Sequence, residues 1–466
     1  MTSRVTVIGG GLAGCEATYQ LVTRGIEVTL YEMRPSRSTR AHKTGNLAEL
    51  VCSNSFRGAS LSNAVGLLKA ELVQCGSLIM KAALQAAVPA GGALAVDRTL
   101  FSEIVDSTIR EHPLCRVVEE EVCSVPQSSE EMPVIIATGP LTSPHLAHPL
   151  EELVGQQSLA FYDAISPIVL GESLDFEKVY RKSRYGKGAG DEYLNIPLSE
   201  SQYYEFVNGV AAAEKFSGHE DVESEVQLRP FEGCMPIEDM IERGLETLRF
   251  GPFKPVGLEH PETGERPYAV CQLRQDDKAG TLWSLVGMQT RMKHPEQLRL
   301  FRTLPGLEGA EFVRLGSVHR NTFLNSPACL SPTLEFRARE GLFFAGQITG
   351  TEGYVESTAG GLVAGLGAYA LCQGQAPRAF PQETAIGSLM GYISDPERRD
   401  FQPMNISFGL MKSYTLGSFP RRTKKPERRK ATSRRALEAL SQFGFHAPLP
   451  EGLLPIEQNG HDNPLN

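Results

Sequence analysis

Residues 4–14 read RVTVIGGGLAG, and this stretch decides the fold. Arg4–Ile8 is a β-branched run of strand length, and residues 15–23 have helical periodicity. A second strand is expected over residues 27–31 (EVTLY), with Glu32 directly after it. A strand, a GxGxxG turn, a helix, a strand and an acid in one short unit are typical of a Rossmann-like dinucleotide site.

Each part of this unit has a physical task. The first glycine permits the tight turn, the second lets the backbone approach a pyrophosphate, and the third lets the helix pack on the strand. The helix N-terminus faces the phosphates, and the acid binds ribose hydroxyls. A glycine-rich turn without a ligand is the alternative for a lone GxGxxG. The cofactor-binding residues expected here are Gly9, Gly10, Gly11, Leu12, Ala13, Gly14 and Glu32.

Two later segments favour FAD as the cofactor. Residues 134–139 (VIIATG) are a buried strand run that ends in Ala-Thr-Gly, and residues 341–350 (GLFFAGQITG) are an apolar strand that enters a glycine-rich turn. A helix rich in small residues follows, and larger side chains in this helix would prevent its close packing against neighbouring elements. This order resembles FAD-binding folds of the glutathione-reductase type, in which the last turn reaches the flavin ring. It adds these candidate cofactor residues: Thr138, Gly139, Gly346, Gln347, Gly350 and Tyr354.

A chain of 466 residues is too long for one simple core. Residues 180–190 (YRKSRYGKGAG) are basic and glycine-rich, which suggests that the chain crosses into another domain there. We therefore predict an α/β protein with a Rossmann-like FAD-binding domain of the glutathione-reductase type and an inserted smaller α/β domain. The first part of the FAD domain is expected at residues 1–182, the insertion at 183–318, the second part at 319–440 and a loose tail at 441–466.

The composition and the cysteine pattern indicate the cellular compartment and the kinds of site to expect. The nine cysteines are odd in number and contain no CxxC pair, which indicates free thiols in a reducing compartment and a cytoplasmic protein. The cysteines and histidines lack metal-ligand spacing, so no metal is expected. The sequence contains no stretch of 18 or more apolar residues, so no membrane span is expected. Nothing in the sequence implies a protein partner.

Residues 421–435 (RRTKKPERRKATSRR) hold nine Lys or Arg and one Glu in a chain whose net charge is −9. A solvated helix end is the alternative interpretation. Nine like charges repel each other, however, and a phosphate backbone would relieve that repulsion. We expect this basic segment to contact RNA.

Seven stretches carry a resemblance to one known family. They are GGGLAGCEA (9–17), YEMRP (31–35), LAELVCSNSFR (47–57), FEGCMPIE (231–238), GPFKPVGLE (251–259), LFFAGQITGTEGYVES (342–357) and FQPMNISFGL (401–410). They resemble the bacterial folate- and FAD-dependent tRNA (uracil-5-)-methyltransferases, TrmFO, from the N-terminus to about residue 440. The related wobble-uridine flavoprotein family MnmG shares the first stretch but is longer and lacks FEGCMPIE.

The resemblance implies a reaction and its partners. Methylenetetrahydrofolate supplies the carbon, reduced FAD supplies electrons, and NAD(P)H re-reduces the flavin. The product is 5-methyluridine at position 54 in the T loop of tRNA, with the basic segment at 421–435 contacting part of the tRNA elbow. Two alternatives stay open: an FAD-dependent NAD(P)H oxidoreductase acting on a small substrate, and a non-catalytic RNA-binding flavoprotein.

This chemistry needs a thiol. C5 of uracil becomes nucleophilic when a thiolate adds to C6, and a second group must then remove the C5 proton. The resemblance implies Cys234 as nucleophile and Cys52 as base or acid, with roles that could be exchanged. The other cysteines are expected to pack as small hydrophobes. Tyr354 is a candidate to stack on the pterin or flavin ring. Candidates for the folate glutamate or a tRNA phosphate are Arg274, Arg291 and Lys293, against an alternative of surface ion pairs.

Overall fold

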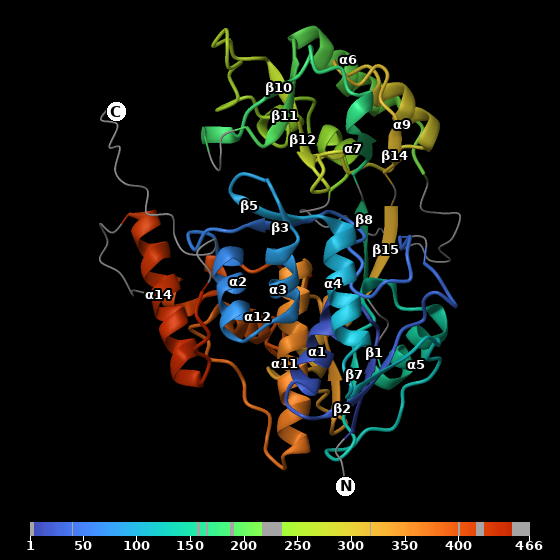
Figure 1. The fold of residues 1–466 in the computed structure, drawn as a ribbon, viewed down its shortest axis with the longest axis vertical. Helices are drawn as coiled ribbons and strands as arrows, with labels where there is room; N and C mark the ends of the chain where they lie inside the picture. Colours follow the sequence, from blue (N-terminus) through green and yellow to red (C-terminus); the bar gives the residue numbers. More distant parts are fainter. Residues whose placement is uncertain are drawn as a thin grey trace.

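The computed structural model describes residues 4–39, 41–155, 159–164, 166–186, 191–216, 235–316, 318–398, 401–415 and 424–449. Two of the sequence predictions fall partly outside these residues: Cys234, and residues 421–423 of the basic segment. Figure 1 shows a larger lobe, which contains both the first and the last described residues of the chain, and a smaller lobe built from its middle.

A five-stranded parallel sheet forms the centre of the larger lobe. Its order is β16-β7-β1-β2-β6, and every neighbouring pair is parallel. The central strands are almost entirely apolar because helices cover both faces of such a sheet. The strands are β1 (Arg4–Ile8), β2 (Glu27–Tyr31), β6 (Cys115–Val118), β7 (Val134–Ile136) and β16 (Leu342–Phe344). Since β16 lies beside β7, the beginning and the last third of the chain share one sheet, which confirms the predicted FAD-type fold.

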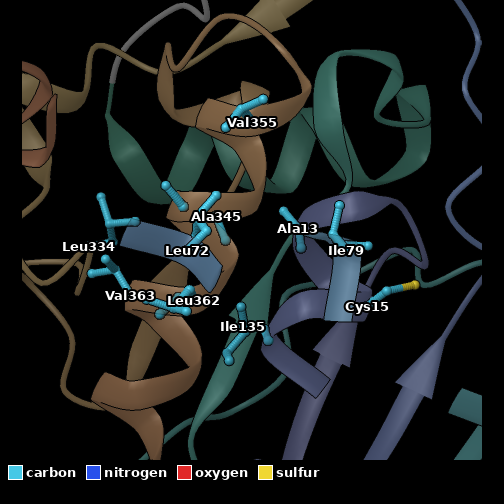
Figure 2. Packing of buried hydrophobic residues seen from close by; sticks show 14 of the residues in the cluster. Ala13, Cys15, Leu72, Ile79, Ile135, Leu334, Ala345, Val355, Leu362 and Val363 are labelled. Atoms are coloured by element: carbon cyan, nitrogen blue, oxygen red, sulfur yellow. The ribbon is translucent and has the colours of Figure 1, made fainter. Parts of the chain in front are cut away.

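Helices α1 (Leu12–Val22) and α11 (Tyr354–Cys372) pack against each other in the core of this lobe. A Cβ added at Gly361 would lie 2.2 Å from the Ala13 carbonyl oxygen, so only glycine permits this approach. Figure 2 shows Ala13 of α1, Leu362 and Val363 of α11 and Ile135 of β7 among the buried apolar side chains of this core. By length and composition α11 could cross a membrane, but 78% of its apolar window is buried inside the protein, as in a core helix.

The larger lobe contains further helices and a small sheet. The helices are α2 (Ala64–Gln74), α3 (Leu78–Gln85), α4 (Arg98–Arg110), α5 (Pro144–Val154), α10 (Ser326–Cys329), α12 (Ala385–Ile393), α13 (Lys412–Thr415) and α14 (Lys425–Phe443). The small sheet has the order β3-β5-β4, from β3 (Ser55–Gly58), β5 (Ala93–Val96) and β4 (Ala87–Val88). In Figure 1, β3 and β5 lie on the side of the larger lobe that faces the smaller one.

The smaller lobe is the insertion, and it has its own sheet and core. Its six-stranded sheet has the order β10-β11-β12-β13-β9-β14, and all its pairs are antiparallel. The strands are β9 (Ile168–Leu170), β10 (Tyr180–Arg181), β11 (Tyr193–Leu198), β12 (Ala269–Gln275), β13 (Leu282–Leu285) and β14 (Phe312–Arg314). The helices are α6 (Glu200–Ala212), α7 (Ile237–Glu242), α8 (Thr247–Phe250) and α9 (His294–Phe301). Its core surrounds the fully buried Trp283.

The chain enters the insertion earlier than the sequence indicated. Strands β9 and β10 belong to the six-stranded sheet although both precede residue 183. Between the lobes lies a two-stranded antiparallel ladder of β8 (Leu159–Ala164) and β15 (Val318–Phe323). The basic stretch that begins at Tyr180 therefore starts with an edge strand of the insertion. The polar composition at its start reflects a sheet edge rather than a link between domains.

Candidate cofactor and catalytic site

A cavity of about 1000 Å³ opens at the carboxyl ends of the parallel strands. This is the edge where an open α/β sheet binds nucleotides. Ten of the thirteen cofactor residues expected from the sequence line it: Gly9, Gly11, Leu12, Ala13, Glu32, Thr138, Gly139, Gly346, Gln347 and Tyr354. The other three, Gly10, Gly14 and Gly350, are packed behind the wall.

The first turn requires glycine for two separate reasons. At Gly9 the backbone has φ of +102°, and an added Cβ would lie 2.5 Å from the Ala137 carbonyl oxygen. At Gly14 an added Cβ would lie 1.8 Å from the Gly9 carbonyl oxygen, so α1 could not approach β1. At Gly11, in contrast, an added Cβ would meet no atom within 4 Å and the residue faces the cavity. The turn therefore forms a cradle. Its backbone at Gly11 is open to the cavity because no side chain covers it, which lets a pyrophosphate group approach closely.

Glu32 lies at the end of β2 with its carboxylate held in place. One oxygen accepts from the Gly10 N–H at 2.8 Å, and the other accepts from Arg34 through its N–H and its Nε. Burial acts to raise the pKa of Glu32, but the hydrogen bonds and charge of Arg34 outweigh it and the pKa lies below its usual value. An ionised carboxylate on the cavity wall suits the hydroxyl groups of a ribose.

The last turn joins β16 to α11 and forms the opposite part of the wall. Gly346 has φ of +79°, and an added Cβ would lie 2.8 Å from Ala13 Cβ. At Gly350, which also has φ of +79°, an added Cβ would lie 2.4 Å from the Phe401 ring. Gln347 faces the cavity and donates to Glu352 at 2.8 Å. These contacts fix the turn that leads directly into Tyr354, and the donor set and cradle together fit FAD.

Sequence reasoning missed a set of polar residues on the cavity wall. Arg34 is 2% exposed and pairs with both Glu32 and Glu49. Its position two residues after the ribose-binding acid is a signal that could have identified it. Other wall residues that the sequence did not single out lie directly after Gly139, in α11 or in loops elsewhere in the chain: His42, Val51, Glu120, Glu121, Val122, Pro140, Leu141, Thr142, Ser143 and Ser357.

Cys52 lies beside this cavity, on the segment that leads into β3. The thiol residue is partly exposed, and its neighbour Val51 lines the cavity wall. The N–H groups of Cys52 and Ser53 both donate to the Tyr354 hydroxyl, at 2.9 and 3.1 Å. Burial, followed by negative charge at Cys52, raises the pKa of Tyr354, so that its hydroxyl stays protonated.

Tyr354 therefore links the two predicted parts of the site. Its side chain lines the cofactor cavity, where stacking on a flavin or pterin ring was expected, and its ring centroid lies 5.6 Å from that of Phe56. Its hydroxyl reaches the segment that carries Cys52. A tyrosine at the start of α11 thus contacts both the cofactor space and a candidate catalytic thiol.

Four of the remaining described cysteines are buried as packing residues, whereas Cys123 is exposed and Cys115 and Cys372 are partly exposed. Burial raises the pKa of Cys15, Cys75, Cys271 and Cys329, and each of these four is buried. All eight cysteines in the described part of the chain are free thiols: Cys15, Cys52, Cys75, Cys115, Cys123, Cys271, Cys329 and Cys372.

One group of described residues has ligand atoms close enough to hold a metal ion. Glu121, Cys123 and His145 place these atoms within 4.8 Å of one another, on the surface near the cavity. However, the Arg37 guanidinium already donates to Glu121 at 2.6 Å and lies 2.8 Å from His145 Nδ1. The Arg37 guanidinium therefore already occupies the position that a metal ion would need between these groups.

Of the three basic residues proposed for anions, only Arg274 lies near Cys52. Its Nη2 donates to Ser53 Oγ at 2.8 Å, and its Nε donates to Asn54 Oδ1 at 3.0 Å. Arg291 pairs with Asp239 at 2.6 Å, and Lys293 pairs with Glu214 at 3.0 Å, as the alternative of surface ion pairs expected.

Within the described residues, positions 425–435 of the basic segment form the first part of α14. Thr432, Ser433, Ala436 and Leu440 are buried against the larger lobe, where Ser433 Oγ donates to the Leu61 carbonyl at 2.8 Å. The opposite face is exposed and cationic. The exposed basic residues in the described part of the segment are Lys424, Lys425, Lys430, Arg434 and Arg435.

Comparison with known proteins identifies the family. The family model of glucose inhibited division protein A, GIDA, matches residues 4–376. A relative from Geobacter sulfurreducens named methylenetetrahydrofolate–tRNA-(uracil-5-)-methyltransferase TrmFO is 55% identical over 443 residues, covering 95% of this chain and 99% of the relative. A relative of the same name from Symbiobacterium thermophilum is 54% identical over 439 residues, covering 94% and 96%.

A solved structure supports the fold independently of these names. Aquifex aeolicus GidA superposes with a TM-score of 0.68 at 17% identity, over 97% of this chain and 74% of that one. Identity at this level shows the fold alone. The relatives above are far more similar and match nearly their whole length, so the chain belongs to the TrmFO family of methylenetetrahydrofolate–tRNA-(uracil-5-)-methyltransferases.

Proposed function

We propose that this protein methylates C5 of the T-loop uridine at position 54 of tRNA, with methylenetetrahydrofolate as carbon donor and FAD as redox cofactor. The observation that carries this proposal is the Tyr354 bridge between the dinucleotide cavity and the Cys52 segment. The cavity alone would serve a flavin oxidoreductase, and the thiol held beside it adds a group that can move the C5 proton of uracil. Membership in the TrmFO family supports the same substrates.

The residues of this chain have separate tasks in the reaction. Gly9, Gly11 and Glu32 bind the dinucleotide and fix its position, and Tyr354 lines the reactive end of the cavity. When bound, FAD supplies the electrons that reduce the transferred carbon to a methyl group, and NAD(P)H restores those electrons. The protein itself must activate the uracil ring and move its protons.

Two thiols would perform that activation. A thiolate that adds to C6 pushes charge into the ring and makes C5 nucleophilic. After C5 has bonded to the donor carbon, a base removes the C5 proton. The bond between that carbon and the nitrogen that delivered it then breaks with its electron pair, the carbon is reduced to methyl, and the C6–S bond breaks as the ring double bond re-forms. We assign the addition to Cys234 and the proton transfer to Cys52. Cys234 lies outside the described residues, so this assignment rests on the FEGCMPIE stretch that resembles the family.

One assay tests the function. Purified protein receives labelled methylenetetrahydrofolate, NADPH and unmodified tRNA, and the nucleosides of the digested tRNA are analysed. We expect labelled 5-methyluridine, and its loss when the T-loop uridine at position 54 is replaced by cytidine. Consumption of NADPH without label in RNA would instead support a small-substrate oxidoreductase. Retention of tRNA with neither result would support a binding protein.

We also propose that the cationic face of α14 binds the tRNA backbone. It presents several exposed basic residues on a helix whose opposite face is anchored in the larger lobe. Phosphate contacts release counterions, so affinity should fall steeply with salt. A cytoplasmic location follows from a tRNA substrate.

Charge reversal at α14 tests this second proposal. We expect Lys430→Glu to weaken tRNA binding and to lower the slope of log affinity against log salt by about one, as the loss of one phosphate contact predicts. Lys81→Glu, which reverses an exposed charge on α3, is the matched control. Equal slopes in the two variants would exclude Lys430 from the tRNA contact. The kcat of Lys430→Glu should stay near that of the unmodified protein.

A further inference from the structure

The backbone at Cys52 is held by side chains rather than by a sheet or helix. Among the described residues, the segment from Leu50 to Ser53 makes no backbone–backbone hydrogen bond. Buried backbone groups must find partners, and here side chains supply them. The Arg98 guanidinium donates to the Leu50 carbonyl at 2.7 Å and to the Cys52 carbonyl at 3.2 Å. Arg314 donates to the Val51 carbonyl.

These contacts hold both peptide planes that flank Cys52. In the plane before it, the Val51 carbonyl accepts from Arg314 and the Cys52 N–H donates to Tyr354. In the plane after it, the Cys52 carbonyl accepts from Arg98 and the Ser53 N–H donates to Tyr354. Because each peptide unit is rigid, holding both ends of two successive planes fixes φ and ψ of the residue between them.

The side chains that hold this segment come from both lobes. Tyr354 begins α11 and Arg98 begins α4, both in the larger lobe, whereas Arg314 is the last residue of β14 in the insertion. Arg98 is itself bound from the insertion, because its Nε donates to the buried Asp276 at 2.8 Å. The backbone of Cys52 is therefore set only when the insertion is docked against the larger lobe.

The charges around Cys52 favour the same arrangement. Three guanidinium groups, Arg98, Arg274 and Arg314, lie around this segment with one ion-paired carboxylate, Asp276. Burial acts to lower the pKa of all three arginines. For Arg98 the charge of Asp276 and its hydrogen bond outweigh burial and the pKa lies above its usual value, whereas the pKa of Arg274 and of Arg314 lies below it. Charge-assisted hydrogen bonds of this kind are shorter and stronger than neutral ones.

We propose that Arg314 of the insertion is a positioning residue for Cys52, and that together with Arg98 and Tyr354 it sets the backbone conformation from which the Cys52 thiol acts. The catalytic part of this inference rests on the proposed function, whereas the structural part does not. A preorganised thiol lowers the barrier because less reorganisation accompanies the reaction.

Hydrogen exchange in the FAD-loaded protein tests the inference without any RNA or folate. We expect Arg314→Ala to accelerate exchange of the Cys52 and Ser53 amides about tenfold, with FAD content unchanged. Arg314→Lys retains the charge and one donor and should restore slow exchange. The matched control is Arg302→Ala, since Arg302 is another insertion arginine that donates to a backbone carbonyl, that of Ala310.

Turnover gives the second readout. Arg314→Ala should lower kcat about tenfold while KM for tRNA changes little, because the variant alters the thiol rather than the RNA surface. Equal amide exchange in Arg314→Ala and Arg302→Ala would overturn the inference, whatever the kcat. If Arg314→Ala does not fold, Tyr354→Phe removes the shared acceptor and the same exchange comparison decides. Should the wild-type protein transfer no carbon, the proposed function fails while the exchange result still decides the positioning role.

Discussion

The cofactor cradle at residues 9–14 and the Cys52 segment at residues 50–53 are two parts of one site, but they are held in different ways. The cradle is made by the backbone itself: glycines permit its turns, and parallel strands fix its direction. The Cys52 segment has no such ladder and depends on Arg98, Arg314 and Tyr354. A cradle built from backbone tolerates few substitutions at its glycines. A segment held by side chains can be loosened one contact at a time.

The largest effect is expected from removing the thiol. Cys52→Ala should lower methyl transfer at least about 100-fold, because loss of a positioned acid or base has effects of this size. FAD content should not change, since Cys52 does not line the cavity. Methyl transfer is measured as 5-methyluridine formed in tRNA, and FAD content is measured by absorbance. The control is Cys372→Ala at the far end of α11, and near-normal transfer by Cys52→Ala would remove that residue from the mechanism.

The cradle should fail in a position-dependent way. Gly14→Ala places a Cβ 1.8 Å from the Gly9 carbonyl oxygen, so it should lower both the thermal stability of the cofactor-free protein and its FAD affinity, the latter about tenfold or more. Gly11→Ala meets no protein atom and should weaken FAD binding alone. Calorimetry and flavin titration distinguish the two. Equal thermal stability of the two cofactor-free variants would contradict a cradle built from backbone packing.

The link between the two regions is the subject of the third prediction. Tyr354→Phe keeps the ring on the cavity wall but removes the acceptor shared by the Cys52 and Ser53 amides. We expect kcat to fall about tenfold, since misplacement of a catalytic group costs rate, with FAD affinity unchanged. Rapid-mixing and titration experiments measure these quantities. A variant that loses FAD and keeps its kcat would reverse the assigned role.

The smallest effect on activity is expected at another backbone segment held by a side chain. Glu71 of α2 accepts from the Ala385 and Ile386 N–H groups at the start of α12, and burial raises its pKa to about 8. The folded state therefore holds a proton between about pH 4.5 and 8 that the unfolded state releases, so stability falls as pH rises across this window.

Glu71→Gln should remove this dependence, because an amide does not titrate. We expect the variant to lose less stability than the wild type between pH 5 and 8, by about 3 kcal/mol. Denaturant unfolding at several pH values measures it. Parallel stability curves for the two proteins would show that Glu71 does not titrate in this window.

The sequence predicted the cradle because backbone geometry leaves a local signature. Gly9, Gly14 and Glu32 occur in fixed order around one strand and one helix, and the structure confirms the FAD-type sheet that this order implied. The apolar strand at residues 342–344 was recognised for the same reason. For these elements the local sequence pattern alone indicates the position that the element takes in the fold.

The support of Cys52 left no such signature. Arg98 lies 46 residues from Cys52, and Arg314 lies 263 residues from Val51, the residues to whose carbonyls they donate. Both are ordinary arginines in sequence. The start of the insertion was also misplaced, because an edge strand at Tyr180 has the polar composition of a linker. Contacts that depend on how two lobes dock are set by tertiary structure, not by a local motif.

The origin of the methyl carbon tests the central claim most directly. The protein is given NADPH, unmodified tRNA and methylenetetrahydrofolate that carries two deuterium atoms on its methylene carbon, and the product nucleoside is weighed by mass spectrometry. Because the methylene group is transferred intact and one further hydrogen is added on reduction, we predict 5-methyluridine with two deuterium atoms in its methyl group. An unlabelled methyl group would contradict folate-dependent transfer by this protein. So would a uridine that stays unmethylated although the protein carries redox-active FAD and the tRNA is correctly folded.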